Sequence, residues 1–461
     1  MLPHRWTTIP LSFVAVLLGA GALFGGKFLP NPLKTSDSSG VLATYSTAGG
    51  IDINNAFFQD LGTNGRTCNT CHISSSAWTI TPADVRAKFD ATQGTDPIFR
   101  TNDGSNCPSA DVSSVSSRRQ AYSQLLTKGL IRVSESVPAN AEFQIITIQD
   151  PYNCPETNAA NPAMYRRPLP ATNLNFLSTI MWDGRETVFG AIPGKSIDLN
   201  QSLTNQAIHA TSGHAQGTVQ PTPQQLSQIV AFETGLFTAQ ENDQHAGSLT
   251  AQGAQGGPVN LSQQNTFVGI NDSLGGDPTG ATFDPNVFMI YGAWANAGSP
   301  HRQSIARGED LFNNLPIPIT GVGGLNDAFN QPVIVGTCTT CHDSPNAGNH
   351  SFSVPLAIGT TAYPAMPALD VAGLPVYTIQ CNTTGAIVQV TDPGRAMISG
   401  KCKDIGKLKG PVLRGLAARA PYFHNGAAAT LDDAVNFYDQ RFNLNLTSQQ
   451  KADLVAFLQT L

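Results

Sequence analysis

The chain has 461 residues, only 13% of them are charged, and its formal net charge is −6. This weakly acidic balance excludes a basic nucleic-acid-binding protein, so we expect no nucleic-acid partner. The 43 glycines and 31 prolines predict much irregular chain, and the length allows three domains or two enlarged ones.

The N-terminus has the pattern of an export signal. His4 and Arg5 precede an apolar run from Leu11 to Phe24, which has the length of a signal-peptide core. Residues 1–27 are therefore predicted to be a signal peptide or an uncleaved N-terminal anchor that tethers the protein to a membrane. Both alternatives place the protein in the periplasm or another extracytoplasmic compartment. Residues 28–50 are rich in Pro, Ser, Thr and Gly and are predicted to be a linker.

A short helix, predicted from Asp52 to Leu61, leads to the first of two identical motifs. Both motifs read C-x-x-C-H, which is the attachment pattern of a c-type haem. In that pattern the two cysteines form thioethers with the porphyrin and the histidine binds the iron. We therefore predict two covalently bound haem c groups. The attachment residues are Cys68 and Cys71 with the iron ligand His72, and Cys338 and Cys341 with the iron ligand His342.

A redox dithiol and a zinc site fit the motifs less well than a haem does. A thioredoxin-like dithiol accounts for the cysteines but not for the histidine that follows them both times. A zinc ion bound by both cysteine pairs would be a single structural site, and it remains an alternative.

Four cysteines lie outside the motifs. An even remainder suggests disulfides, and hence an oxidising compartment. Cys107 and Cys154 both lie between the two motifs, and Cys381 and Cys402 both lie after the second motif. We therefore predict the bridges Cys107–Cys154 and Cys381–Cys402.

The sequence between the motifs contains only a few clear signals of secondary structure. Polar residues and prolines dominate 73–163, and Gly, Gln and Asn dominate 240–285, so both segments are predicted to be irregular. A capping box at Thr222 and Gln225 predicts the start of an amphipathic helix.

We place the domain boundary near Gly298, which gives an N-terminal haem c domain at 51–297 and a C-terminal haem c domain at 298–461. The second domain opens on a helix pattern, Ser304 to Asn313, like the one before the first motif, and closes on a helix capped by Thr447. No sheet-forming alternation is sustained. The predicted fold class is therefore mostly α, with two cytochrome c-like haem domains and long irregular loop insertions.

Parts of the sequence resemble the bacterial di-haem cytochrome c peroxidases, including their MauG-like branch. Trp182-Asp183-Gly184-Arg185 is similar to the Trp-Asp-Gly-Arg segment of that family. Leu408 to Gly426 is similar to its Pro-x-Leu-Arg…Ala-Pro-Tyr-Phe-His-x-Gly signature. The recognisable stretches are 65–72, 166–185 and 304–461.

The resemblance implies a division of labour between the haems. The haem on His72 would react with hydrogen peroxide. The haem on His342 would take electrons from a periplasmic donor protein, or share oxidising equivalents. Trp182 would lie between the haems and couple them, and the alternative is an ordinary core tryptophan.

The chain departs from the family in two places. Members usually carry a distal glutamate shortly after that tryptophan, whereas Ser202 to Gln216 contain no carboxylate. The positions that supply an inter-domain calcium site look occupied by Arg167 and Arg419. Calcium beside two arginines is unfavourable unless carbonyls provide all the ligands, so a bound calcium is doubtful.

His214 falls near the place where the family has its glutamate. We therefore expect it on the distal side of the first haem, with His209 as the second candidate. A pKa near 6.5 lets an imidazole move a proton from one peroxide oxygen to the other. Iron ligation by His214, which would close the site, and a plain surface histidine remain the alternatives.

Tyr438 is the expected distal ligand of the second haem. It is the fourteenth residue after His424, where peroxidase members place a methionine and the MauG branch places a tyrosine. A phenolate stabilises ferric iron and lowers the potential, whereas a thioether does the reverse. Met397 and His350 are the other ligand candidates nearby, and a packed helix tyrosine is the plain alternative.

Three functions are consistent with these features. The first is a periplasmic di-haem c oxidoreductase of the cytochrome c peroxidase/MauG type, which uses peroxide at the N-terminal haem while the C-terminal haem relays or stores oxidising equivalents. The second is a non-catalytic electron-transfer cytochrome with two six-coordinate haems. The third is oxidation of a side chain on a partner protein. The retained tryptophan and signatures favour the enzyme.

Overall fold

The computed structural model describes residues 28–190 and 196–461, so the predicted signal peptide or anchor lies outside the described residues. The described residues form ten α-helices and thirteen β-strands. The helices are α1 Pro82–Thr92, α2 Val115–Ala121, α3 Ser123–Lys128, α4 Leu199–Gly213, α5 Pro223–Gly235, α6 Gly257–Ser262, α7 Pro300–Asn314, α8 Ala396–Ser399, α9 Leu431–Phe442 and α10 Ser448–Gln459. Within the described residues, no helix is long and apolar enough to cross a membrane.

The strands make the fold mixed, and the prediction of a mostly α fold is wrong in this respect. They are β1 Phe28–Leu29, β2 Leu33–Ser36, β3 Gly40–Ser46, β4 Ile51–Asp52, β5 Ile131–Ser134, β6 Phe143–Gln149, β7 Ala163–Arg166, β8 Leu236–Asp243, β9 Gly247–Ser248, β10 Ile317–Thr320, β11 Val333–Gly336, β12 Val376–Cys381 and β13 Ile387–Val390. They form small sheets of two to four strands. Apart from β3, β6 and β8, the strands have two to six residues, too few for an alternating pattern to be detected in the sequence.

Residues 28–50 are not a linker. Strand β3 lies inside the four-stranded sheet β2-β3-β8-β9, where it pairs with β2 on one side and β8 on the other. Leu42, Ala43 and Thr44 of this strand are buried. The N-terminal strands are therefore part of the folded body.

Strands from the two halves of the sequence also pair with each other. β12 lies between β13 and β6, so a C-terminal strand joins an N-terminal one. Both predicted disulfides are confirmed: Cys107 is bonded to Cys154, and Cys381 at the end of β12 is bonded to Cys402.

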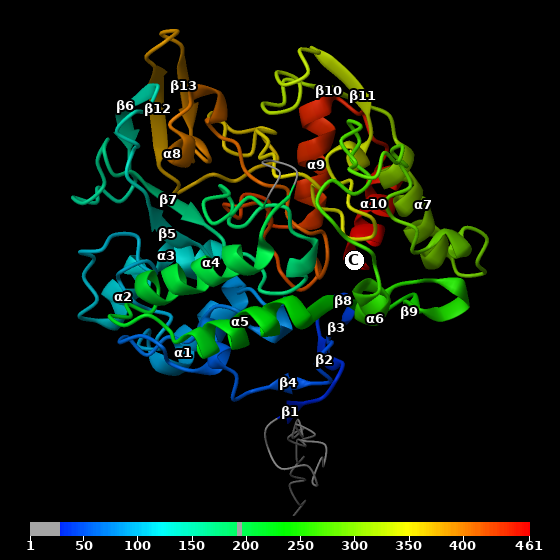
Figure 1. Ribbon diagram of the computed structural model, residues 1–461, viewed down its shortest axis with the longest axis horizontal. Helices are drawn as coiled ribbons and strands as arrows, with labels where there is room; N and C mark the ends of the chain where they lie inside the picture. The colour runs from blue at the N-terminus through cyan, green and yellow to red at the C-terminus, as the bar shows by residue number, and fades with distance from the viewer. Residues whose placement is uncertain (1–27, 191–195) are drawn as a thin grey trace, which may run out of the picture.

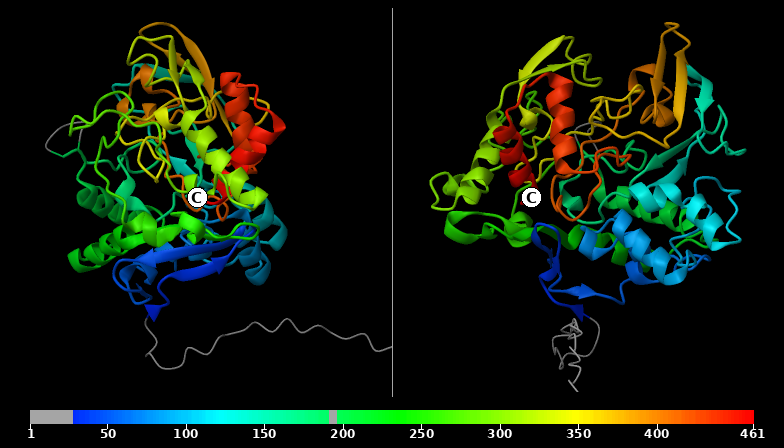
Figure 2. Two further views of the ribbon diagram at one scale, coloured as in Figure 1. Left: turned by 90° about the vertical axis from the view of Figure 1, so that its right-hand side faces the viewer. Right: turned by 180° about the vertical axis from the view of Figure 1, so that it is seen from behind.

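Helices α7, α9 and α10 gather on one side of the molecule and α1 to α5 on the other (Figure 1; Figure 2). The predicted caps of α5 and α10 are present, with Thr222 and Thr447 as N-caps. Gly308 lets α7 approach α10 closely, since a Cβ there would lie 2.0 Å from the carbonyl oxygen of Asp453. The helix expected from Asp52 to Leu61 is reduced to a single 3₁₀ turn, Ala56–Phe58.

The core under α7 and α10 begins well before the expected domain boundary. Leu249, Phe288, Tyr291 and Trp294 are buried in the same cluster as Phe457 of α10. The stretch before Gly298 thus packs with the C-terminal helices.

Candidate active site

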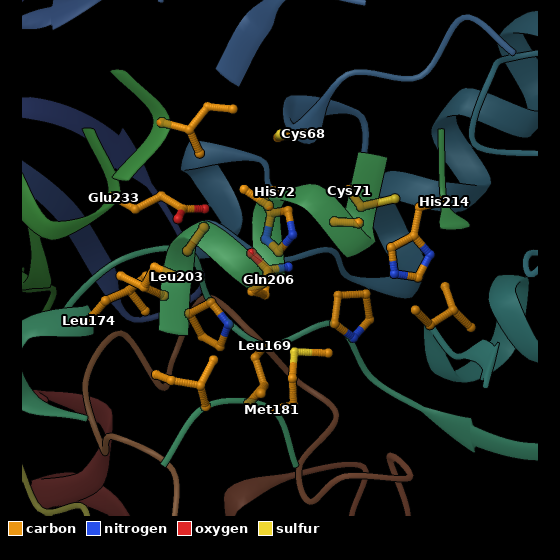
Figure 3. A pocket seen from close by; sticks show the side chains of 18 of the residues that line it. Cys68, Cys71, His72, Leu169, Leu174, Met181, Leu203, Gln206, His214 and Glu233 are labelled. Atoms are coloured by element: carbon orange, nitrogen blue, oxygen red, sulfur yellow. The ribbon is translucent and has the colours of Figure 1, made fainter. Parts of the chain in front are cut away.

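The first motif opens into a cavity that we call the first cavity. Cys68 begins a 3₁₀ turn whose capping box is formed by Thr67 and Thr70. The turn directs both thiols and His72 into one space, because Cys68, Cys71 and His72 all line the cavity (Figure 3). Burial raises the pKa of the Cys68 thiol to about 12 and that of Cys71 to about 11.

The ring of His72 is fixed through one nitrogen. Its Nδ1 lies 2.9 Å from the carbonyl oxygen of Trp78. A carbonyl only accepts, so Nδ1 carries the proton and Nε2 keeps a free lone pair. Burial lowers the pKa of His72 to about 4, which keeps the ring neutral. A neutral imidazole held by a carbonyl is the usual form of a metal-ligating histidine.

The second motif repeats this arrangement in a second cavity. Cys338 starts a 3₁₀ turn, and Cys338, Cys341 and His342 line the space together. His342 Nδ1 donates to the carbonyl oxygen of Gly348 at 2.6 Å, and burial lowers the pKa of this ring as well. The two sites therefore have the same local chemistry.

The cavities fit a haem rather than a bare metal ion. No group of three His, Cys, Asp or Glu side chains within the described residues is arranged to hold a metal, so these residues offer no zinc site built from both motifs. The walls are mainly apolar but contain basic side chains, Arg419 and Lys409, that have no carboxylate partner among the described residues. The Nε of Arg419 has no hydrogen bond among the described residues, and Lys409 Nζ donates to the carbonyl of Thr179. The propionate groups of a haem are carboxylates with which such basic side chains can pair.

Trp182 lines both cavities, together with Arg167, Lys409 and Pro411. Its indole nitrogen donates to the carbonyl of Arg167 at 2.8 Å, and its own carbonyl accepts from the Lys409 N–H at 2.8 Å. The tryptophan is thus fixed between the cavities by hydrogen bonds to two other residues that line both.

His214 lies at the C-terminal end of α4 and lines the first cavity. Its Nδ1 is 2.5 Å from Asp103, and Asp103 is bonded to Arg66 at 2.6 Å. Burial opposes ionisation of Asp103, but the hydrogen bond and charge of His214 together with Arg66 hold its pKa below the ordinary value. The second candidate, His209, bonds Glu186 and does not line either cavity.

The sequence pattern missed a carboxylate in the first cavity. Glu233 extends from α5 toward the cavity on the side of Cys68, while His214 extends from the side of Cys71 (Figure 3). The Oε2 of Glu233 has no hydrogen-bond partner among the described residues, and burial raises the pKa of this group to about 8. Gln206 of α4 also lines the cavity. Helical spacing could have revealed Glu233, which lies one turn beyond the predicted apolar face of its helix.

Tyr438 lines the second cavity from α9 and is stacked on Phe442. Burial raises the pKa of its hydroxyl. His350 also lines this cavity, whereas Met397 is buried in a separate cluster with Phe143. Tyr438 therefore lines the same cavity as His342, whereas Met397 does not line it.

No family model matches the chain. Cytochrome-c peroxidase IdrP1 of Denitromonas iodatirespirans is 34% identical over 144 residues, which are 27% of this chain and 36% of the relative. Cytochrome c551 peroxidase of Nitrosomonas europaea is 38% identical over 69 residues, 15% of this chain and 21% of the relative. The chain is distantly similar to di-haem cytochrome c peroxidases. The match spans only about a third of the first relative's length.

Solved structures give a weaker likeness. A MauG-like protein associated with microbial copper homeostasis covers 88% of this chain, at 15% identity and a TM-score of 0.39. A hydrazine synthase from Kuenenia stuttgartiensis covers 83% at 14% identity and a TM-score of 0.33. Both TM-scores are too low to carry an argument about function.

Proposed function

We propose that the chain is an exported di-haem c oxidoreductase of the peroxidase type. Peroxide would react in the first cavity, and the second cavity would relay or store oxidising equivalents drawn from a donor or substrate protein. The observation that carries this proposal is the pair of C-x-x-C-H cavities with one tryptophan, Trp182, in the wall of both.

Covalently bound haem would supply the iron centre at which a peroxide O–O bond is cleaved. The protein's part in the first cavity is to handle protons. Nδ1 of His214 is held by Asp103 at 2.5 Å, so its Nε2 is the atom left to accept a proton from one peroxide oxygen and return it to the other. Arg66 keeps Asp103 ionised and in place.

Glu233 serves the same cavity in a second way. A pKa of about 8 leaves this carboxyl protonated at neutral pH, so it can donate a hydrogen bond without placing a charge in an apolar wall. A neutral acid and a histidine–aspartate pair that line the same cavity are groups suited to proton transfer.

Electron paramagnetic resonance of the oxidised holoprotein tests the proposal together with its peroxide reaction. We expect one high-spin and one low-spin haem, and rapid spectral change when hydrogen peroxide is added to the protein reduced by a small c-type cytochrome. Two low-spin haems and no reaction with peroxide would instead establish an electron-transfer cytochrome. That result would fit ligation of the iron by the free Nε2 of His214.

A further inference from the structure

The hydrogen bond that orients His72 depends on an unusual turn. The acceptor carbonyl belongs to Trp78, whose φ is 57°, and the preceding Ala77 has φ 52°. Two successive non-glycine residues in the left-handed region are strained, and such strain persists only where the surroundings hold it.

In the second cavity, the histidine of the motif is oriented by the same kind of hydrogen bond, but without backbone strain. There the acceptor is Gly348, with φ 69°, and glycine adopts this conformation freely. A glycine at 78 would therefore suffice for the backbone. The presence of a tryptophan there calls for a role of its side chain.

The Trp78 side chain is anchored to the N-terminal strand β3. The indole is buried, and its Nε1 donates to Thr44 Oγ at 3.0 Å. Thr44 Oγ lies 2.9 Å from Thr238 Oγ on β8, which lies 2.9 Å from Thr172 Oγ. Thr172 in turn donates to the carbonyl of Leu236 at 3.1 Å.

The direction of this chain is fixed by proton counting. Each hydroxyl has one hydrogen, and that of Thr172 goes to a carbonyl, so Thr172 accepts from Thr238. Thr238 must then accept from Thr44, whose oxygen is left to accept from the indole. The indole is the last donor of a fully ordered, buried series.

The carbonyl of Trp78 also joins the proximal side to the wall shared by the cavities. It accepts from the backbone N–H of Ala171 at 2.9 Å, in addition to His72. Ala171 lines the first cavity, and the neighbouring Pro170 lines both cavities. A shift of this one carbonyl would disturb both the iron ligand and that wall.

We propose that strand β3 tunes the first haem site: Thr44 holds the indole of Trp78, and the turn so held sets the strength of the His72 Nδ1 hydrogen bond. Thr44 and Trp78 are positioning residues, and the inference rests on the proposed haem ligation by His72. A strong Nδ1 hydrogen bond makes Nε2 a better donor to ferric iron and lowers the reduction potential.

Removing the Thr44 hydroxyl leaves the indole N–H buried without an acceptor. The cost of such an orphaned donor is comparable with the strain stored in the turn, so the turn is expected to relax. The hydrogen bond to His72 then weakens, because its acceptor moves.

The test compares Thr44→Val with Thr44→Ser in the holoprotein. The readouts are the iron–histidine stretching band of the reduced protein, by resonance Raman, and the potential of each haem. Thr44→Val should move the band of the first site to lower frequency and raise that haem's potential, while Thr44→Ser should keep both at wild-type values. The second haem should not change, since His342 bonds Gly348.

Thr238→Val cuts the series one hydroxyl further away and should shift the same readouts in the same direction by less. If Thr44→Val fails to fold, Thr238→Val serves as the test in its place. Wild-type values in the valine variants, or an equal shift in Thr44→Ser, would overturn the inference. Absence of a haem on His72 in the wild type would overturn the proposed function as well, so the two failures are distinguishable.

Discussion

His214 and Glu233 approach His72 from opposite sides and differ in how they hold a proton (Figure 3). His214 shares its Nδ1 proton with a buried aspartate, and its side chain is 42% exposed. Glu233 is buried without a partner for one oxygen. The histidine can thus exchange protons with solvent, whereas the glutamate keeps its proton because the apolar wall disfavours the charge.

Replacing His214 by alanine should slow the reaction with hydrogen peroxide by roughly 10²- to 10⁴-fold, the usual contribution of a positioned acid–base group. Stopped-flow spectroscopy of the holoprotein measures this rate. The matched control is His209→Ala, because His209 bonds Glu186 outside the cavities and should react at the wild-type rate. An unchanged rate and an unchanged haem spectrum in His214→Ala would refute its assignment.

Glu233→Gln should remove a pH dependence of stability. The folded-state pKa of about 8 is raised above the ordinary 4.5, so the stabilising effect of the bound proton is complete below about pH 4.5 and is lost as the pH rises through about 8. The wild type should therefore lose a few kcal/mol relative to Glu233→Gln across this window. Denaturant unfolding at several pH values measures the difference, and parallel curves for the two proteins would contradict the expectation.

Among the elements, helices were more predictable than strands. The caps of α5 and α10 are local signals, and both follow from four neighbouring residues. β6 and β12 pair across about half of the sequence, so no local pattern could predict their sheet. Helical spacing places Glu233 on the buried face of α5, but only the packing of α5 brings that face to the first cavity.

The helix α9 brings Tyr438 to the second cavity. If its oxygen binds the second iron, Tyr438→Phe should turn a low-spin haem high-spin and raise its potential, since a negatively charged ligand is lost. Electron paramagnetic resonance and redox titration check both effects. Tyr363→Phe, at an exposed tyrosine outside both cavities, is the control. A low-spin signal that survives in Tyr438→Phe would return the role to His350, which lines the same cavity.

Across the whole molecule, an internal cation holds segments from both halves together. Arg167 donates to the carbonyls of Ile80 at 2.7 Å, Lys128 at 2.9 Å and Arg419 at 3.1 Å. Carbonyl oxygens of this kind are ligands that calcium would otherwise take. Burial and the nearby Arg419 lower the pKa of Arg167 to about 9, which still leaves it charged at neutral pH.

Calcium should therefore have no role here. Treatment with a chelator, or addition of calcium, should change neither the haem spectra nor the melting temperature, because the guanidinium already supplies the positive charge. Arg167→Ala should destabilise the protein by about 3 kcal/mol or more, since it leaves buried carbonyls unpaired. A melting temperature that falls on chelation would show that a metal is present after all.

We expect the coupling of the two haem sites to depend on Trp182, which lines both cavities. Trp182→Phe keeps an aromatic ring but loses the N–H that bonds the Arg167 carbonyl. Each haem should keep its own spectrum, because Trp182 lies between the cavities and is neither an attachment residue nor a proposed iron ligand. Electron exchange between the sites should slow by roughly tenfold, which corresponds to about 1.4 kcal/mol in the barrier.

The control for this substitution is Trp294→Phe, which removes a buried tryptophan whose N–H bonds Ala251 in the C-terminal core, away from both cavities. Both substitutions should lower stability, so only an effect specific to position 182 reports on coupling. Rapid-mixing spectroscopy after peroxide addition, followed at each haem separately, measures the exchange. Equal slowing of electron exchange in the two variants would show that Trp182 acts only through packing. Slowing in Trp182→Phe alone would establish Trp182 as the connection between the sites.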